Sequence, residues 1–506
     1  MTLSADDPIA KQVRRALRSG DLARAEAIVS DAERQGAPSA FTRWALATVR
    51  RRTGHPDAAL ALLRDALSID ANFLRAAQDL GAALMGAGDA EAGLAAYRHA
   101  QSLAPTTPAI RSAVLMAMHY CASVSLPEIA EGHRAYGGLY PAVPRPPAWP
   151  RDPGGRLRVG FVSGDFRGHS TASFLPPLLE GRDPARWEVL LYSNVGLPDE
   201  TTRRFQALAD RWIDAAFLDD DALATRIRAD RIDALIDLNG HTVGNRLGMF
   251  ARRPAAFQAT WLDYVFSTGL TQIDHFISDA DHAPPAEDAL HVGRPLRLAT
   301  GTFCMAPPPD LPVAPRPPGP FTFGSFNALE KVGPGVLRTW AEILRAAPDT
   351  RLVISAAALD RTHGRERVIG TLDAAGIGRE RVDLLGRADR AAFVRRYEAI
   401  DLHLDSFPYS GGLTTLEAMW MGVPTLTFAG DRIAGRHSAS HLRRAGLGEF
   451  VVADREAYVA AAMRLAGAPE RLHALRPALR FLVMRSSLVD GRAQAEAMHA
   501  ALMRHA

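Results

Sequence analysis

The sequence predicts an α-helical repeat array followed by two α/β domains in one chain. Three observations lead to this fold class. A repeat of constant period runs through the first hundred residues, strands and helices then alternate in two separate regions, and proline-rich segments divide the three parts. A chain of 506 residues is also too long for one hydrophobic core, so several domains are expected.

Composition narrows the classes of function. With 47% apolar and 23% charged residues, the chain is typical of a globular protein. The formal charge is only +3 and basic residues are scattered, so nucleic acid is not an expected partner. The two cysteines, Cys121 and Cys304, are far apart, which favours a reducing compartment. Because neither a signal-like start nor a long apolar run is present, we expect a cytoplasmic protein without a membrane span.

The repeat is marked by Gly20, Gly54 and Gly88, each followed by an alanine-rich stretch. Their spacing of 34 residues is the period of tetratricopeptide repeats, in which paired helices meet at a turn. We therefore assign residues 1–115 to a tetratricopeptide solenoid. Stacked repeats form a concave face that usually holds a peptide or protein, which predicts a protein partner. The alternative is that three repeats only brace the next domain.

Residues 116–155 connect the repeats to the first α/β region. A capping helix is expected near residues 108–120, and the proline-rich passage at 140–150 marks a boundary.

The first α/β domain is predicted at residues 156–305. Strands are expected at 157–163, 187–192 and 232–238, and a helix at 203–216. His169 and His241 lie in the loops after the first and third of these strands. Because open parallel sheets bind ligands at the carboxyl ends of their strands, both histidines are candidates for a site, although a lone loop histidine is more often structural.

A proline-rich linker at 306–320 precedes the second α/β domain, residues 321–506. Its central feature, at 405–424, reads as strand, glycine loop and helix. Gly411 and Gly412 would let a ligand approach the backbone, and the first turn of the helix would attract a diphosphate. Thr414 and Thr415 could cap the helix or bond phosphate oxygens, and Glu417 could accept two ribose hydroxyls. An ordinary capped helix is the alternative.

Two further groups of basic side chains stand near this loop. Lys331 follows the first strand of the second domain, where an ammonium could balance a leaving diphosphate, although most lysines are solvated surface groups. His437 and His441 have the spacing of one helical face. No glutamate follows the first histidine and no third ligand is evident, so we expect no metal there.

Six segments, in this order, resemble the bacterial SPINDLY-type and O-linked N-acetylglucosamine transferases. They are residues 158–169, 239–242, 252–256, 324–327, 405–424 and 436–441. With the repeats, the likeness covers nearly the whole chain. It implies two Rossmann-like domains facing each other in a GT-B arrangement, behind a tetratricopeptide superhelix.

The resemblance implies transfer of a sugar, with inversion, from a nucleotide-sugar to Ser or Thr of a protein, without a cofactor or metal. It places 156–305 on the acceptor side and 321–506 on the donor side. His169 and His241 would then line the acceptor side, and Lys331 would face the diphosphate; these three are the candidate catalytic residues. Arg396 would meet the nucleobase. The predicted donor-binding set is Asn327, Arg396, Ser410, Gly411, Gly412, Thr414, Thr415, Glu417, Arg436, His437 and Ser438.

Three departures from the family pattern leave the sugar and the nucleotide open. Trp261 and Leu262 are followed by residues 263–268, Asp-Tyr-Val-Phe-Ser-Thr, where relatives commonly have a Gly-Tyr-Pro-Gly-Thr type of segment. Phe393 replaces a histidine that glucosamine-transferring relatives place against uracil, and Leu413 replaces a polar residue. Because an aromatic ring stacks on any base, nucleotide binding is still expected.

A UDP-sugar, carrying N-acetylglucosamine or a related sugar, is therefore the first expectation for the donor, with a GDP- or CMP-sugar as alternatives. Bacterial relatives suggest flagellin or another surface protein as the acceptor. Two other functions stay open: a tetratricopeptide scaffold whose transferase domains are inactive, and a transferase that acts on a lipid or glycan.

Overall fold

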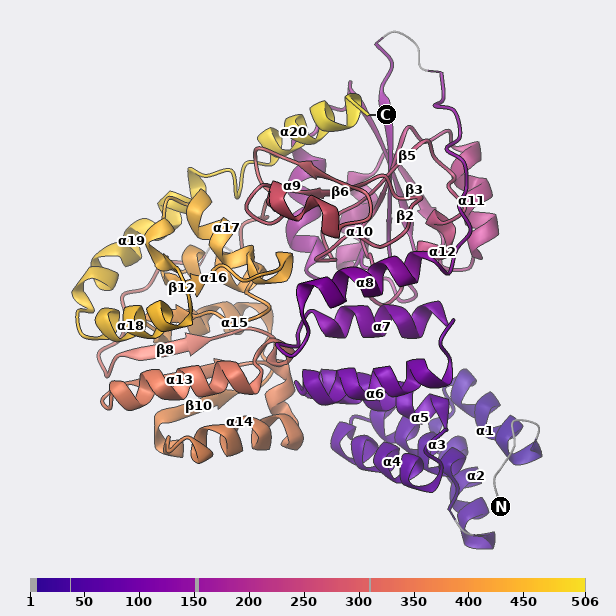
Figure 1. Cartoon of the computed structure of the whole chain (residues 1–506), viewed down its shortest axis with the longest axis horizontal. Coiled ribbons are helices and arrows are strands. Elements are labelled where there is room, and N and C mark those ends of the chain that lie inside the picture. Colours follow the sequence, from indigo (N-terminus) through magenta and orange to yellow (C-terminus); the bar gives the residue numbers. More distant parts are fainter. Residues whose placement is uncertain (1–6, 37, 151–153, 309–310, 506) are drawn as a thin grey trace.

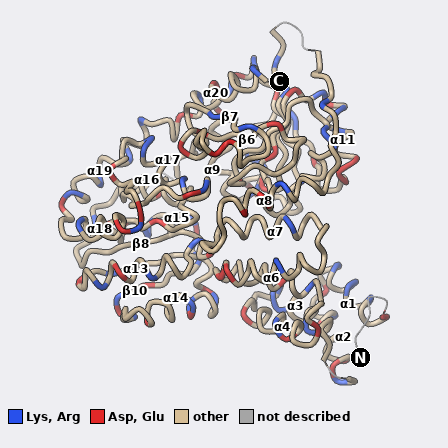
Figure 2. The backbone as a smooth tube through the Cα atoms, in the orientation of Figure 1, with Lys and Arg blue, Asp and Glu red and all other residues tan. Residues whose placement is uncertain are grey.

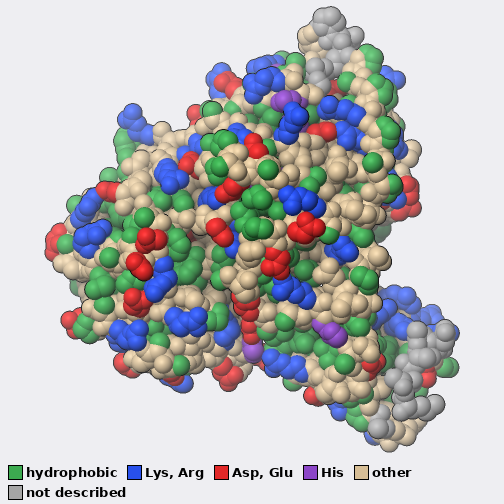
Figure 3. All heavy atoms as spheres, viewed as in Figure 1, with side chains coloured by type: hydrophobic (Ala, Val, Ile, Leu, Met, Phe, Trp, Pro, Cys, Tyr) green, Lys and Arg blue, Asp and Glu red, His purple; other side chains and the backbone are tan. Residues whose placement is uncertain are grey.

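The structure is a computed structural model that describes residues 7–36, 38–150, 154–308 and 311–505. A helical array leads into two α/β domains that lie side by side (Figure 1). Acidic and basic residues are interspersed along the backbone, and they are mixed on the face seen in the space-filling view (Figures 2 and 3). Among the helices described, none is both long enough and apolar enough to cross a membrane.

Within the described part of residues 7–103, six helices form the array, in three pairs. Gly20, Gly54 and Gly88 lie between the helices of each pair and have φ values of 78°, 84° and 82°, which a glycine adopts without strain. The predicted helical repeats are therefore confirmed. The helices are α1 Pro8–Ser19, α2 Leu22–Gln35, α3 Ala40–Arg52, α4 Pro56–Ile69, α5 Leu74–Gly86 and α6 Ala90–Leu103.

Two more helices join the array to the first α/β domain. Helix α7, Pro108–Met118, occupies the position of the expected capping helix, and α8, Leu126–Gly137, follows it. Their apolar residues belong to the same buried cluster as the first α/β domain. Residues 141–150 then continue without a helix or strand.

The first α/β domain contains a seven-stranded parallel sheet in the order β3-β2-β1-β4-β5-β6-β7. Its strands are β1 Leu157–Ser163, β2 Trp187–Ser193, β3 Arg211–Asp214, β4 Ala234–Asp237, β5 Phe257–Thr260, β6 His275–Ser278 and β7 Arg294–Arg297. Its helices are α9 Thr171–Gly181, α10 Glu200–Leu208, α11 Asp220–Ala229 and α12 Leu247–Phe250, with a 3₁₀ turn η1 at Pro285–Leu290.

The predicted helix at residues 203–216 is wrong. Helix α10 ends at Leu208, and the chain then enters β3, whose residues pair with β2 in parallel register. Asp210 fixes the change of direction, because its carboxylate accepts a hydrogen bond from the Val189 N–H at 2.8 Å. Pairing with a distant strand thus overrides the local helical pattern.

The second α/β domain has a six-stranded parallel sheet in the order β10-β9-β8-β11-β12-β13. Its strands are β8 Thr322–Ser325, β9 Arg351–Ser355, β10 Val382–Leu385, β11 Leu402–Leu404, β12 Thr425–Phe428 and β13 Val451–Val452. Its helices are α13 Pro334–Ala346, α14 Thr362–Ala374, α15 Arg390–Arg395, α16 Leu413–Trp420, α17 His437–Arg444, α18 Arg455–Ala466 and α19 Glu470–Met484. Short 3₁₀ helices lie at η2 Leu329–Lys331, η3 Ala357–Asp360, η4 Arg379–Arg381, η5 Arg396–Ala399, η6 Ile433–Gly435 and η7 Gly448–Phe450.

Both sheets have a point at which the strand order reverses, between β1 and β4 in one domain and between β8 and β11 in the other. Ligands of doubly wound folds bind outside the carboxyl ends of the strands at this point. Buried apolar residues of both domains belong to one connected cluster, so the two domains pack against each other.

The last helix belongs by sequence to the predicted second domain, residues 321–506, but it packs on the first domain. Helix α20, Gly491–Met503, crosses back and packs on α9 of the first domain (Figure 1). Gly181 and Gly491 make this close approach possible, since a Cβ added to Gly181 would lie 2.4 Å from the Gly491 carbonyl carbon. The Met305 N–H also donates to the Leu488 carbonyl at 2.6 Å. The C-terminal segment therefore ties the two domains together.

Candidate active site

The loop between β11 and α16 is shaped by the buried carboxylate of Asp405. One of its oxygens accepts hydrogen bonds from the Ser406 and Gly411 N–H groups at 2.9 and 2.7 Å, and the other accepts one from the Thr427 hydroxyl at 2.7 Å. Burial raises the pKa of Asp405, and these hydrogen bonds oppose the rise. Asp405 thus fixes the conformation of the glycine loop, a role that the sequence did not suggest.

Lys331 lies against the glycine loop. Its ammonium donates to the Ser410 carbonyl at 3.0 Å and sits 4.0 Å from the centre of the Tyr409 ring. Burial lowers the pKa of Lys331 to about 8, while Asp405 and Glu330 oppose that shift. A preorganised cation at this point is suited to a diphosphate.

The predicted phosphate-binding residues form one hydrogen-bonded group. The Thr414 hydroxyl donates to the Asn327 side-chain oxygen at 2.6 Å, and the Thr415 and Ser438 hydroxyls lie 2.7 Å apart. A Cβ added to Gly411 would lie 2.6 Å from the Thr415 hydroxyl, so only glycine fits beside these side chains. Gly412 precedes α16 and supplies no side-chain cap, which leaves the N–H groups of the first turn available to a ligand.

Glu417, Arg396 and Phe393 line a neighbouring part of the second domain. The Glu417 side chain is 1% exposed and forms an ion pair with Arg390. Burial raises the pKa of Glu417 to about 7, and Arg390 opposes the rise. Arg396 donates to the Ser355 hydroxyl and the Gly386 carbonyl, both at 2.6 Å. The half-buried Phe393 ring lies 5.9 Å from the Phe326 ring, centre to centre.

Ser410, Arg436 and His437 connect the loop to the first domain. The Ser410 hydroxyl accepts from the His437 N–H at 3.0 Å. Arg436 donates to the His282 carbonyl at 2.9 Å and forms an ion pair with Glu287. The His437 and His282 rings meet at 2.9 Å, Nδ1 to Nε2, across the domain boundary. These residues of the predicted donor set therefore also hold the two domains together.

Around this contact, Asp279 and His441 complete a buried group. Asp279 lies 2.8 Å from His282 Nδ1, and the His441 ring is 6.4 Å from that of His282. Burial lowers the pKa of His437 and of His441, the latter to about 3, so both rings are neutral near pH 7. A cavity of about 20 Å³, room for one water molecule, lies between the two domains here.

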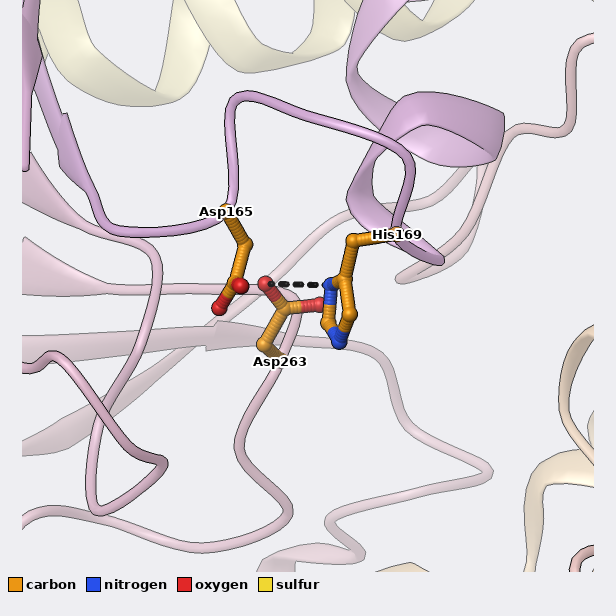
Figure 4. A group of neighbouring side chains, drawn as sticks. All are labelled: Asp165, His169 and Asp263. Atoms are coloured by element: carbon orange, nitrogen blue, oxygen red, sulfur yellow. Dashed lines mark ion pairs between the residues drawn. The ribbon is translucent and has the colours of Figure 1, made fainter. Parts of the chain in front are cut away.

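On the acceptor side, His169 lies beside two carboxyl groups. Its Nδ1 is 3.0 Å from the Thr171 hydroxyl and 3.8 Å from an oxygen of Asp263, and Asp165 lies next to them (Figure 4). Ligand-type atoms of Asp165, His169 and Asp263 all fall within 4.8 Å of one another. Asp165 uses its two oxygens on Arg167 and on the side chain of Asn239, so hydrogen bonds and an ion pair account for its orientation.

His241 has a different environment. Its Nδ1 lies 2.9 Å from the Ser112 hydroxyl of α7, and its Nε2 lies 2.8 Å from the Thr268 carbonyl. The side chain is buried, and burial lowers the pKa of His241 to about 4. Both ring nitrogens therefore have partners, and these contacts fasten α7 to the first domain. A catalytic role for His241 stays a prediction.

Tyr409 connects the two halves of the site. Its ring stacks on Tyr120 at 4.8 Å and 18°, and it lies under the Lys331 ammonium. Burial and the charge of Asp263 both raise the pKa of Tyr409, which places the Asp263 carboxyl within electrostatic reach. The loop with Lys331 and the loop with His169 thus face each other through Tyr409 and Asp263.

Sequence reasoning missed several of these residues. Asp263 appeared only as a departure from a family segment, and Tyr409, Arg390, Asp279 and His282 were not singled out. One signal was available: Asp263 follows a short, mostly apolar run, residues 257–262, so it stands near a strand end as the histidines do. The ring and ion-pair partners could not be found this way because they lie far apart in the sequence.

Comparison with known proteins agrees with this architecture. The model of the family described as glycosyl transferase family 41 matches residues 145–305 and 316–498. The chain belongs to glycosyl transferase family 41, which confirms the resemblance drawn from the six segments.

Plant proteins and one solved structure are among the similar proteins. The protein named "Probable UDP-N-acetylglucosamine--peptide N-acetylglucosaminyltransferase SPINDLY" is 36% identical in Petunia hybrida over 392 residues, 74% of this chain and 42% of that protein. Its namesake in Arabidopsis thaliana is 36% identical over 389 residues, 74% of this chain and 43% of that protein. The chain thus spans about two fifths of the length of these curated relatives.

The structural match extends over the whole molecule. A lysine-to-methionine mutant of the Thermobaculum terrenum O-GlcNAc transferase superposes with a TM-score of 0.89 at 34% sequence identity. The match covers 98% of this chain and 97% of that one, so the repeat array and both α/β domains are included.

Proposed function

We propose that this chain is a protein O-glycosyltransferase that moves a sugar from a nucleotide-sugar to Ser or Thr of a protein, with inversion at the anomeric carbon. The observation that carries the proposal is the meeting of two loops across the domain boundary. Lys331 contacts the glycine loop of the second α/β domain, and His169 lies beside Asp263 in the first. The names of the plant relatives and of the structural match support the same activity.

The residues on the donor side have distinct roles in this proposal. The ammonium of Lys331 and the N–H groups that begin α16 stabilise the negative charge that grows on the departing diphosphate. The Thr414 hydroxyl, which donates to Asn327 in this structure, turns its proton to a phosphate oxygen when the donor binds. Glu417 accepts the ribose hydroxyls, and Arg390 favours the ionised form of that carboxyl group by opposing the rise of its pKa. This chemistry requires no cofactor beyond the donor.

On the acceptor side, His169 takes the proton of the attacking hydroxyl. Its side chain is 35% exposed, so an acceptor can reach it. The inverting reaction needs the hydroxyl to stand behind the anomeric carbon, opposite the diphosphate. His169 and Lys331 lie on opposite domains, which suits these two roles.

The donor that we propose is a UDP-sugar, because the names of the plant relatives specify UDP-N-acetylglucosamine. A GDP- or CMP-sugar is the alternative, since Phe393 would stack on any base. We propose that the repeat array selects the acceptor, with flagellin or another surface protein as candidates. The free thiols of Cys121 and Cys304 fit a reducing compartment, which supports action in the cytoplasm.

Thermal-shift measurements with UDP-, GDP- and CMP-sugars test the proposal first. We expect one class to raise the melting temperature, and mass spectrometry should then find the same sugar on Ser or Thr of host proteins. If no nucleotide-sugar binds, the chain is a scaffold. If a donor binds but lipid or glycan carries the sugar, the acceptor class is wrong.

A further inference from the structure

Asp263 is a buried acidic residue at the centre of the acceptor site. Within the described residues, no lysine or arginine forms an ion pair with it. Its side chain is 6% exposed. Its oxygen accepts a short hydrogen bond from the Thr171 hydroxyl, and its backbone N–H donates to the Leu238 carbonyl at 3.3 Å. The preceding Leu262 has φ 72°, a strained value for leucine, and such strain gathers at functional sites. The fold thus holds this carboxyl group in place although the backbone at Leu262 is strained.

Stability alone does not explain an aspartate here. Burying a carboxyl group that lacks a compensating charge destabilises a fold. Asparagine could accept the Thr171 hydrogen bond without ionising. The position therefore suits a titratable group that acts on its neighbours.

The hydrogen bonds give His169 one orientation. The Thr171 hydroxyl has a single proton, and that proton points to Asp263. When Asp263 is ionised, Thr171 must then accept from His169, so the proton of the neutral ring lies on Nδ1, 3.0 Å from the hydroxyl. The Thr171 backbone N–H also lies near Nδ1, but at 3.5 Å it is the longer and weaker contact. Within the described residues no hydrogen bond involves Nε2, so this atom is left to receive a proton.

We propose that Asp263 and Thr171 are positioning residues for His169 in sugar transfer: they fix the ring with Nε2 toward the acceptor hydroxyl, and the Asp263 carboxylate stabilises the imidazolium that forms. This inference rests on the proposed function and adds Asp263 and Thr171 to the residues that take part in it. The carboxylate acts through the hydroxyl, because Asp263 and His169 are 3.8 Å apart.

In the transfer step, one bond forms and one bond breaks. The oxygen of the acceptor Ser or Thr forms a bond with the anomeric carbon, and the bond from that carbon to the diphosphate oxygen breaks. The diphosphate leaves with both electrons of the broken bond and faces Lys331. The hydroxyl proton moves to Nε2 of His169, while the Nδ1 proton stays hydrogen-bonded to Thr171.

The charges around Asp263 set the pH at which this arrangement forms. Burial raises the pKa of Asp263 to about 8; the Thr171 hydrogen bond opposes the rise, and Asp165 and Asp237 add to it. Burial also lowers the pKa of His169, with Asp165 opposing and Arg167 assisting. Tyr409 also faces this site, since the charge of Asp263 raises the pKa of Tyr409. Ionised Asp263 beside neutral His169 therefore becomes the main form above about pH 8.

Steady-state kinetics from pH 6 to 9 test the proposal, on the full chain with the donor identified above. We expect Asp263→Asn to lower kcat about 100-fold, within the range for losing assistance to a general base. It should also remove the rise of the rate between pH 6 and pH 8 and keep donor affinity within twofold of wild type. Thr171→Val should act like Asp263→Asn, and Thr171→Ser should restore most of the rate.

Asp199→Asn is the matched control. The Asp199 carboxylate accepts from the Gly168 N–H at 2.7 Å, so it touches the loop of His169 without touching the ring. If Asp263→Asn and Asp199→Asn lower kcat equally and leave the pH profile unchanged, Asp263 is only structural and the proposal is overturned.

A second measurement separates this inference from the proposed function. Nitrogen-15 NMR of the imidazoles, with His169→Gln for assignment, reports the tautomer of His169 without turnover. Above pH 8, where Asp263 is ionised, a proton on Nδ1 in wild type that shifts toward Nε2 in Thr171→Val supports the positioning role even if no donor binds. A proton on Nε2 in wild type overturns that role, whatever the activity.

Discussion

Two buried groups of the first α/β domain should make its stability depend on pH in opposite directions. Neutral His241 has a pKa of about 4 in the folded state, against 6.5 for a free histidine. Its contribution to stability is complete above pH 6.5 and is lost as the pH falls toward 4, because only the unfolded state takes up the proton. From pH 7 to pH 5 the loss is about 2 kcal/mol.

Asp263 behaves in the opposite way. Its pKa is about 8 in the folded state, against 3.8 for a free aspartate, so the folded state keeps a proton that the unfolded state releases. Stability is then highest below pH 4 and falls as the pH rises toward 8. Between pH 5 and pH 7 the free energy of unfolding drops by about 2.5 kcal/mol through this group.

Urea unfolding followed by circular dichroism at pH 5, 6 and 7 measures both effects. Relative to wild type, His241→Gln should gain about 2 kcal/mol at pH 5 compared with pH 7, and Asp263→Asn should gain about 2.5 kcal/mol at pH 7 compared with pH 5. Comparing the two pH values cancels the cost of lost contacts, such as the Ser112 hydrogen bond of His241. Differences that stay within about 0.5 kcal/mol across this range would refute the assigned pKa shifts.

Three further predictions concern the proposed activity. Lys331→Ala should lower kcat by about two to three orders of magnitude while UDP binding weakens less, and a kcat within a few-fold of wild type would contradict the role of Lys331. Wild-type activity should fall above pH 8, because Lys331 then loses its proton. Glu417→Ala should weaken donor binding by about 1–3 kcal/mol in calorimetry. The control Arg395→Ala, at an exposed residue of the adjoining α15, should not weaken it, and a Glu417→Ala variant that binds the donor as tightly as this control would exclude Glu417 from the donor site. Deleting residues 1–38, which include α1 and α2, should leave donor affinity within twofold and reduce modification of the protein acceptor in mass spectrometry; undiminished modification would exclude these helices from acceptor selection.

The deletion stops at residue 38 because the later repeats are part of the transferase. Asp57 accepts a hydrogen bond from the Thr362 N–H at 2.8 Å, and Gly88 packs against Leu329. Ser112 of α7 binds His241. A cut at residue 115 would therefore remove contacts of both α/β domains along with the repeats.

The sequence by itself determined the order and type of most elements. A fixed 34-residue period and an alternation of apolar runs with helical stretches are local patterns, so the repeats, the two sheets and the strand-loop-helix unit at 405–424 follow from them. A Cβ on Gly411 would meet both threonine hydroxyls, and the predicted approach of a ligand to its backbone stays a prediction.

Only the tertiary structure decided which residues meet. Residues 211–214 form a strand because β2 offers them a ladder, and α20 lies on the first domain because two glycines, 310 positions apart, allow backbones to touch. Both ring nitrogens of His241 have partners, one of them on α7, while His169 keeps an exposed ring beside Asp263. A local pattern encodes whether a side chain is buried but not which distant group faces it, and the chemistry of this site depends on those distant pairs.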